Sequence, residues 1–80
     1  MKVSVLFFGI AKDIAKSNSI EMEVNDKSTL EELKNTLIEI YPEFVSINDF
    51  SLAVNETYIE GEYFLKAHDV IAIIPPVSGG

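Results

Sequence analysis

The chain has 80 residues and a globular composition, in which 48% of the residues are hydrophobic and 24% are charged. This length predicts one domain with a modest core, because so short a chain buries only about 60–65% of its unfolded surface. Thirteen acidic residues against six basic ones give a net charge of −7. That balance argues against nucleic acid as a partner and favours partners with basic surfaces.

The composition also excludes several kinds of site. The chain has no cysteine, which rules out disulfides, thiolate metal sites and cysteine nucleophiles. Its single histidine, His68, leaves no histidine cluster for a metal ion. No apolar run approaches the length of a membrane span, and the first eight residues are too short and too alternating for a signal peptide. We therefore expect a cytoplasmic protein without a bound metal or a membrane partner.

Residues 2–8 predict the first strand. Alternation places Val3, Val5 and Phe7 on one face and puts Phe8 on the other. Both faces therefore carry large apolar groups, although a sheet that is covered by a helix on one side needs only one apolar face. The second apolar face predicts either a docking surface or a small packing layer beneath the loops.

The next segments predict a short helix and a second strand. Gly9 breaks the first strand, and residues 10–16 predict a short helical turn. Residues 20–24 alternate strictly, which is typical of a strand. Glu21 and Glu23 share the polar face of this strand. Because they have no second titrating partner nearby, we interpret them as a solvated face rather than as an acid/base pair.

A capping box at Ser28-Thr29-Leu30-Glu31 predicts the start of the main helix, with Ser28 as the cap and Glu31 reaching back to it. Pro42 ends this helix at Tyr41. In so small a chain, a single amphipathic helix must cover the sheet, so its apolar stripe is core. The stripe consists of Leu30, Leu33, Leu37 and either Ile40 or Tyr41.

Residues 43–49 predict a mixed connection whose apolar residues, Phe44, Val45 and Ile47, fold back on the core. Two short strands at residues 50–54 and 57–59 then flank a predicted two-residue turn. Asparagine tolerates the left-handed backbone that such a turn needs, which suits the Asn55-Glu56 pair. The chain therefore predicts a hairpin, followed by a loop from Gly61 onward.

The chain ends on an apolar strand and a tail without bulky side chains. Residues 70–74 predict a buried strand, and two prolines forbid its continuation. Because prolines favour an extended course, we expect a domain over residues 1–74 and an extended tail over residues 75–80 that presents the carboxylate of Gly80. The lack of Cβ atoms at Gly79 and Gly80 would let this tail pass through a narrow channel.

These elements predict an α+β fold with one main helix packed across a mixed sheet of four to five strands. This is the β-grasp plan of ubiquitin, in which the first and last strands lie side by side in the sheet centre. Alternation then places Ile71 and Ile73 on one face of the last strand and Ile74 on the other. Phe8 and Ile74 would meet on the face away from the helix, near the root of the tail.

The sequence resembles the MoaD family, the ubiquitin-like sulfur carriers that form the small subunit of molybdopterin synthase. The resemblance is carried by Val5-Leu6-Phe7-Phe8, by Leu52-Ala53-Val54-Asn55 with Thr57, and by Pro75-Pro76-Val77-Ser78-Gly79-Gly80. It implies that Gly80 is adenylated, is converted to a thiocarboxylate and donates sulfur to the pterin precursor in molybdenum cofactor biosynthesis.

The resemblance also implies roles for single residues. Gly80 would be the reacting centre and Gly79 would keep the tail slim. Phe8, Tyr58 and Ile74 would lie in an apolar interface with the large synthase subunit. The reach of the tail would be set by Pro75, Pro76, Val77 and Ser78.

On this reading the carrier binds no cofactor and is not an enzyme on its own. Its partners would be the large synthase subunit, a ubiquitin-activating-like adenylating enzyme that uses ATP, and a sulfur donor that acts on the adenylate. Three alternatives stay open: a ubiquitin-like modifier conjugated through Gly80, a sulfur carrier for thiamin or tRNA thiolation, and a plain β-grasp interaction module whose tail does nothing.

Overall fold

A computed structural model describes residues 1–76 of the chain, and for residues 46–48 it describes the backbone alone. One mixed sheet has the strand order β2-β1-β5-β3-β4. Its strands are β1 (Lys2–Phe7), β2 (Ser19–Glu23), β3 (Ser51–Val54), β4 (Thr57–Tyr58) and β5 (Val70–Ile74). The first and last strands, β1 and β5, pair in parallel in the middle of the sheet, whereas the other pairs are antiparallel. This topology confirms the predicted β-grasp plan.

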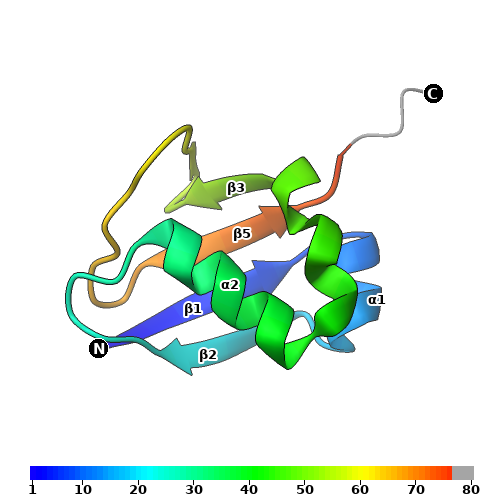
Figure 1. The fold of residues 1–80 in the computed structure, drawn as a ribbon, viewed down its shortest axis with the longest axis horizontal. Coiled ribbons are helices and arrows are strands. Elements are labelled where there is room, and N and C mark those ends of the chain that lie inside the picture. The colour runs from blue at the N-terminus through cyan, green and yellow to red at the C-terminus, as the bar shows by residue number, and fades with distance from the viewer. Residues whose placement is uncertain (77–80) are drawn as a thin grey trace.

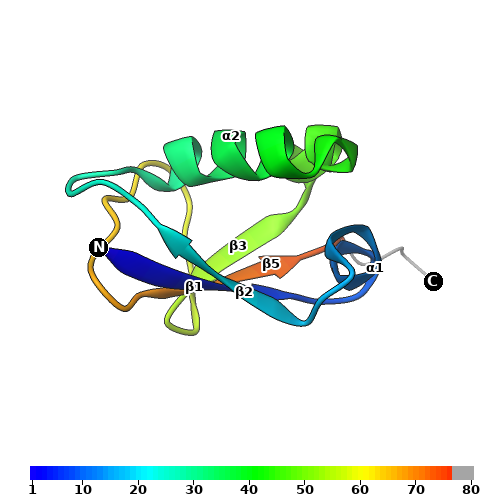
Figure 2. The same ribbon diagram turned by 90° about the horizontal axis from the view of Figure 1, so that it is seen from below.

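The helices form a layer on one side of this sheet. Helix α2 (Leu30–Ile40) crosses that side and continues into the 3₁₀ helix η1 (Pro42–Asp49), whereas the short helix α1 (Ile10–Ala15) lies at one end of the sheet (Figures 1 and 2). Figure 2 shows that the opposite side carries no helix within residues 1–76. Over the same residues, no helix combines the length and the apolar character that crossing a bilayer requires.

The strand boundaries agree with the predicted ones to within one residue, and the turn between β3 and β4 is confirmed. Asn55 and Glu56 have positive φ angles of 49° and 72°. Left-handed backbone at both central residues is the type I′ geometry that matches the twist of the flanking strands. The short hairpin therefore follows from the local sequence.

The core lies between α2 and the sheet. In the predicted apolar stripe of α2, Leu30, Leu33 and Leu37 are buried and face fully buried residues of the two central strands, among them Val5 and Ile71. Ile40 is 50% exposed, so the stripe ends on Tyr41, which is half-buried against the core. Phe44 of η1 is also fully buried, and its ring stacks on that of Phe7 with 5.9 Å between the centroids. Aromatic pairs of this kind stabilise a core beyond the area that they bury.

The prediction that Val45 folds back on the core is wrong, because its side chain is 71% exposed. A 3₁₀ helix has three residues per turn, so the turn that directs Phe44 inward directs its neighbour outward. The side chain of Ile47, which was predicted to join them, lies outside the described part of the structure.

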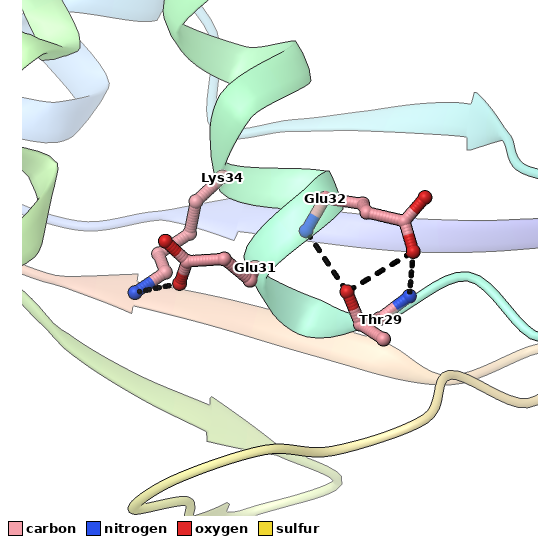
Figure 3. Close-up of polar contacts among 4 residues, drawn as sticks. All are labelled: Thr29, Glu31, Glu32 and Lys34. Carbon is pink, nitrogen blue, oxygen red and sulfur yellow. Dashed lines mark hydrogen bonds and ion pairs between the residues drawn. The ribbon is translucent and has the colours of Figure 1, made fainter.

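The cap of α2 is Thr29, which corrects the predicted cap at Ser28 by one residue (Figure 3). The Thr29 Oγ1 accepts a hydrogen bond from the Glu32 N–H at 3.1 Å, and the Glu32 Oε1 accepts one from the Thr29 N–H at 3.1 Å. The sequence contains two overlapping capping boxes, since both hydroxyl residues have a glutamate three positions later.

The second box is used because the backbone of Ser28 has other partners. Its N–H donates to the Asn25 carbonyl, and its own carbonyl accepts from the Leu65 N–H at 2.8 Å. An N-cap carbonyl would instead accept the first hydrogen bond of the helix. Glu31, which the first box would have used, forms an ion pair with Lys34 at 2.9 Å (Figure 3).

A buried carboxylate, Asp69, fixes the loop that leads into β5. Its Oδ1 accepts from the Asn55 side-chain amide at 2.9 Å, and its Oδ2 accepts from the Tyr63 hydroxyl at 3.1 Å and from the Lys66 N–H at 2.8 Å. Burial, together with the hydrogen bond and the negative charge of Asp69, raises the pKa of Tyr63. The side-chain Oδ1 of Asn55 accepts a hydrogen bond from the Val70 N–H at 3.0 Å. These bonds tie the hairpin turn and the loop to the start of β5.

Candidate functional site

The tail begins at Pro75, directly after β5 in the middle of the sheet. Residues 71–73 of β5 are paired with β1 on one side and with β3 on the other. Pro75 and Pro76 follow this strand without an intervening loop. A strand that is paired on both sides and has buried residues opens less readily than an edge strand or a loop. The predicted tail residues Val77, Ser78, Gly79 and Gly80 lie outside the described residues, so their roles stay predictions.

The sheet face away from α2 is an apolar surface, which we call the open face. The strand register places four residues in one row across β1, β5, β3 and β4: Leu6, Ala72, Ala53 and Tyr58. Ala53 is buried although it does not belong to the main core cluster. The row therefore lies on the opposite side of the sheet from the core.

The three residues predicted to bind a partner all lie on the open face. Phe8 is 47% exposed, Tyr58 is 65% exposed, and Ile74 is half-buried. Phe8 follows the Phe7–Ile73 pair, which places it beside Ile74, and its N–H donates to the Ile73 carbonyl at 3.3 Å. The structure brings Phe8 and Ile74 together at the root of the tail, whereas Tyr58 lies on the edge strand.

A shallow hollow on the open face includes residues that the sequence did not assign to a site. Beside β1 and β5 residues, its lining contains Asn55 and Glu56 from the hairpin turn. The turn was predicted from its residues, but nothing in the local sequence indicates which face it borders. The register of β3 against β5 decides that. The full lining is Leu6, Phe8, Asn55, Glu56, Val70 and Ala72.

The chemistry that the open face can support is apolar contact. Over residues 1–76, no cluster of three or more histidine, aspartate or glutamate side chains could hold a metal ion. The buried Asp69 has its hydrogen-bond partners within the protein. A sheet face without a covering helix that exposes Phe8 and Tyr58 is typical of a surface that binds another protein.

Comparison with known proteins supplies the family. The profile of the ThiS family matches residues 5–80. The chain belongs to the ThiS family. A Dictyostelium discoideum protein named molybdopterin synthase sulfur carrier subunit is 41% identical to this ThiS-family chain over 80 residues, which cover 95% of the chain and 93% of that protein. The predicted resemblance to the small subunit of molybdopterin synthase is confirmed by the name of this relative and by the family match.

Solved structures of similar proteins share the fold of this ThiS-family chain. A chain from the complex of subunits 1 and 2 of the Helicobacter pylori molybdopterin-converting factor is 32% identical, with both chains fully covered and a TM-score of 0.71. The small archaeal modifier protein 1 of Haloferax volcanii has a TM-score of 0.84 at 18% identity, with 95% and 98% of the two chains covered. At that identity the likeness shows the fold alone.

Proposed function

We propose that this ThiS-family chain is the sulfur carrier subunit of a molybdopterin synthase. In this role the Gly80 thiocarboxylate donates sulfur to the pterin precursor of the molybdenum cofactor. The observation that supports the role most directly is the central strand β5, which passes straight into Pro75 and Pro76 beside an exposed apolar face. Relatives that match almost the whole chain carry this name.

Conversion of the Gly80 carboxylate to a thiocarboxylate needs partner proteins that activate the carboxylate and supply the sulfur. A carboxylate is a poor electrophile until activation supplies a leaving group. An adenylating enzyme would join the Gly80 carboxylate to the AMP part of ATP and release pyrophosphate. The terminal sulfur of a donor persulfide would then displace AMP, and a thiol reductant would cleave the resulting acyl disulfide to leave the thiocarboxylate. The chain has no cysteine, so it cannot supply this sulfur from a thiol of its own. In the proposed role the carrier binds no cofactor and catalyses no reaction on its own.

The open face is the proposed docking surface for the large synthase subunit. Phe8, Tyr58 and Ile74 would pack against an apolar surface of that subunit, as the exposure of Phe8 and Tyr58 allows. The related Helicobacter pylori protein was solved in a complex of subunits 1 and 2. A net charge of −7 would favour encounter with basic surfaces on these partners. We place the carrier in the cytoplasm, where it needs neither nucleic acid nor a membrane.

The test is mass spectrometry of the C-terminal peptide after incubation with ATP, an adenylating enzyme, a persulfide donor and a thiol reductant. Exchange of oxygen for sulfur adds about 16 Da, and so does oxidation of Met1 or Met22, so the peptide must be weighed rather than the intact chain. A gain confined to the peptide that ends in Gly80, and absent without ATP, is the expected result. Adding the large subunit and the pterin precursor should then remove the sulfur from this peptide.

Three other results would contradict the proposal. Gly80 linked to lysines of other proteins would identify a modifier. A thiocarboxylate that the large subunit does not consume would identify a sulfur carrier for thiamin or tRNA thiolation. A chain that keeps its function after deletion of Gly79 and Gly80 would be a plain interaction module.

A further inference from the structure

Gly9 lies between β1 and α1, beside the root of the tail. Its backbone angles are φ 55° and ψ −131°. An ideal Cβ at this glycine would lie 3.2 Å from the Cγ atom of Pro75 and 3.8 Å from its Cδ atom. Figure 1 shows α1 and the start of the tail at the same end of the molecule. The turn after the first strand therefore packs against the first residue after the last strand.

A side chain at position 9 would meet two obstacles. The positive φ disfavours any L residue other than glycine. In addition, the proline ring is rigid and cannot rotate away from a new methyl group as a flexible side chain would. Pro75 follows a strand that is paired on both sides. Any adjustment must therefore move either the β1–α1 turn or the direction in which the chain leaves β5.

The start of α1 gives independent support for a special role of this glycine. Gly9 is the N-cap of α1, and no side chain forms a capping hydrogen bond there. Serine, threonine or aspartate would normally supply that bond. A capping side chain at this position would project from the Cβ site that Pro75 approaches. The helix therefore begins without a side-chain cap, and the proline ring approaches the space that a side chain would fill.

We infer that Gly9 is a positioning residue for the tail. By leaving room for the Pro75 ring against the β1–α1 turn, it fixes the direction in which the chain leaves β5, and so the delivery of Gly80 to the adenylating enzyme. Phe8 of the open face directly precedes Gly9. The β1–α1 turn that packs against Pro75 is therefore continuous with the proposed docking face. This inference rests on the proposed function, because it takes Gly80 as the reacting residue.

The experiment compares four variants by steady-state adenylation of Gly80 and by thermal unfolding. Gly9→Ala introduces the methyl group beside Pro75. Gly61→Ala is the matched control, because Gly61 also has a positive φ, 86°, but nothing lies within 4 Å of its Cβ position. Pro75→Ala removes the ring atoms Cγ and Cδ, and the Gly9→Ala/Pro75→Ala double variant tests whether the two residues act together.

We expect Gly9→Ala to lower kcat about 10- to 100-fold, because a small displacement of a reacting group is enough for such a loss. The KM for the carrier should stay within about twofold, because the substitution changes the root of the tail and leaves the rest of the carrier surface unchanged. Gly61→Ala should lower the melting temperature without changing kcat. Pro75→Ala should also lower kcat, and adding Gly9→Ala to it should change kcat by less than about twofold.

Several results would overturn the inference. A wild-type kcat in Gly9→Ala would show that Pro75 does not need this space, and a raised KM with unchanged kcat would make Gly9 a docking residue. Additive losses in the double variant would show that the two residues act separately. If Gly9→Ala does not fold, Pro75→Ala becomes the test, and a wild-type kcat in that variant would overturn the inference. A wild-type chain that is not adenylated at all would instead refute the proposed function, and this inference with it.

Discussion

Phe7 and Phe8 are adjacent in the chain and lie on opposite faces of the sheet. Phe7 is 2% exposed and packs in the core with Phe44, whereas Phe8 is 47% exposed on the open face. On the neighbouring strand, Ile73 is fully buried and Ile74 is only half-buried. The same residue types therefore lie in two different environments on the two faces. Folding requires the apolar residues beneath α2, and those on the other face are available to a partner.

The largest effect on stability should come from Phe7→Ala on the covered face. Truncating a buried phenylalanine removes its contacts and leaves a cavity, which costs about 3–5 kcal/mol of unfolding free energy. Phe8→Ala is the matched control one residue away, and its cost should stay below about 1 kcal/mol. Urea unfolding of both variants measures the difference. Equal losses would contradict the division of the sheet into a core face and a docking face.

A smaller effect should come from Tyr63→Phe, which removes the hydrogen bond to Asp69 at the end of the sheet where β5 begins. We expect a loss of about 1.5 kcal/mol at neutral pH, since the acceptor is a carboxylate. Tyr58→Phe, on the open face, should change the unfolding free energy by less than about 0.5 kcal/mol. A larger loss in Tyr58→Phe would show that the open face contributes to folding.

The same tyrosine predicts a pH dependence. The pKa of Tyr63 is raised in the folded chain by burial and by Asp69. Its contribution to stability is therefore complete below the unfolded pKa of about 10 and is lost as the pH rises through the raised value. Urea unfolding between neutral pH and the highest tolerated pH should show a steeper loss in the wild type than in Tyr63→Phe. Parallel curves would contradict this assignment.

Thr29→Ala should cost about 1 kcal/mol, because it removes the cap of the helix that covers the core face. Ser28→Ala tests the overlapping capping box and should cost less. Both variants should bind the large subunit normally once folded, since neither residue lies on the open face. A larger loss in Ser28→Ala would support the cap predicted from the sequence over the one in the structure.

Phe8→Glu should have the smallest effect on folding, within about 0.5 kcal/mol, because its side chain is exposed. Its binding to the large subunit should fall by tenfold or more, since a charge would replace an apolar side chain in the proposed interface. Val45→Glu is the control, because Val45 is an exposed apolar residue in the helical layer. Titration calorimetry with the large subunit measures both. Equal affinities would exclude the open face as the interface.

Much of this fold could be predicted because local patterns agree with it. Alternation separated Phe7 from Phe8, and the turn residues Asn55 and Glu56 fixed the hairpin. The errors arose where two local solutions were equally good. Ser28 and Thr29 both begin capping boxes, and only the contact of Ser28 with Leu65, far along the chain, decides between them. The exposure of Val45 depends on a 3₁₀ turn that its sequence did not indicate.

For the candidate site, the Gly79-Gly80 ending and the two prolines predict a presented carboxylate. This stays a prediction, because both glycines lie outside the described residues. The residues that support the start of the tail could not be predicted. Gly9 was interpreted only as the residue that breaks the first strand. Its proximity to Pro75 depends on the parallel pairing of β1 with β5, which joins the two ends of the domain. No local pattern reports a contact between segments so distant in sequence.

The parallel pairing of β1 with β5 also affects how the domain is made during translation. β1 is synthesised first, but β5, its partner in the middle of the sheet, leaves the ribosome only after every other strand. Pairings between such distant segments form slowly, because a long loop must be closed first. Until β5 inserts between β1 and β3, the sheet lacks its middle strand. Since Pro75 directly follows β5, insertion of this strand both completes the domain and anchors the tail, which would limit presentation of an anchored tail to chains that have folded.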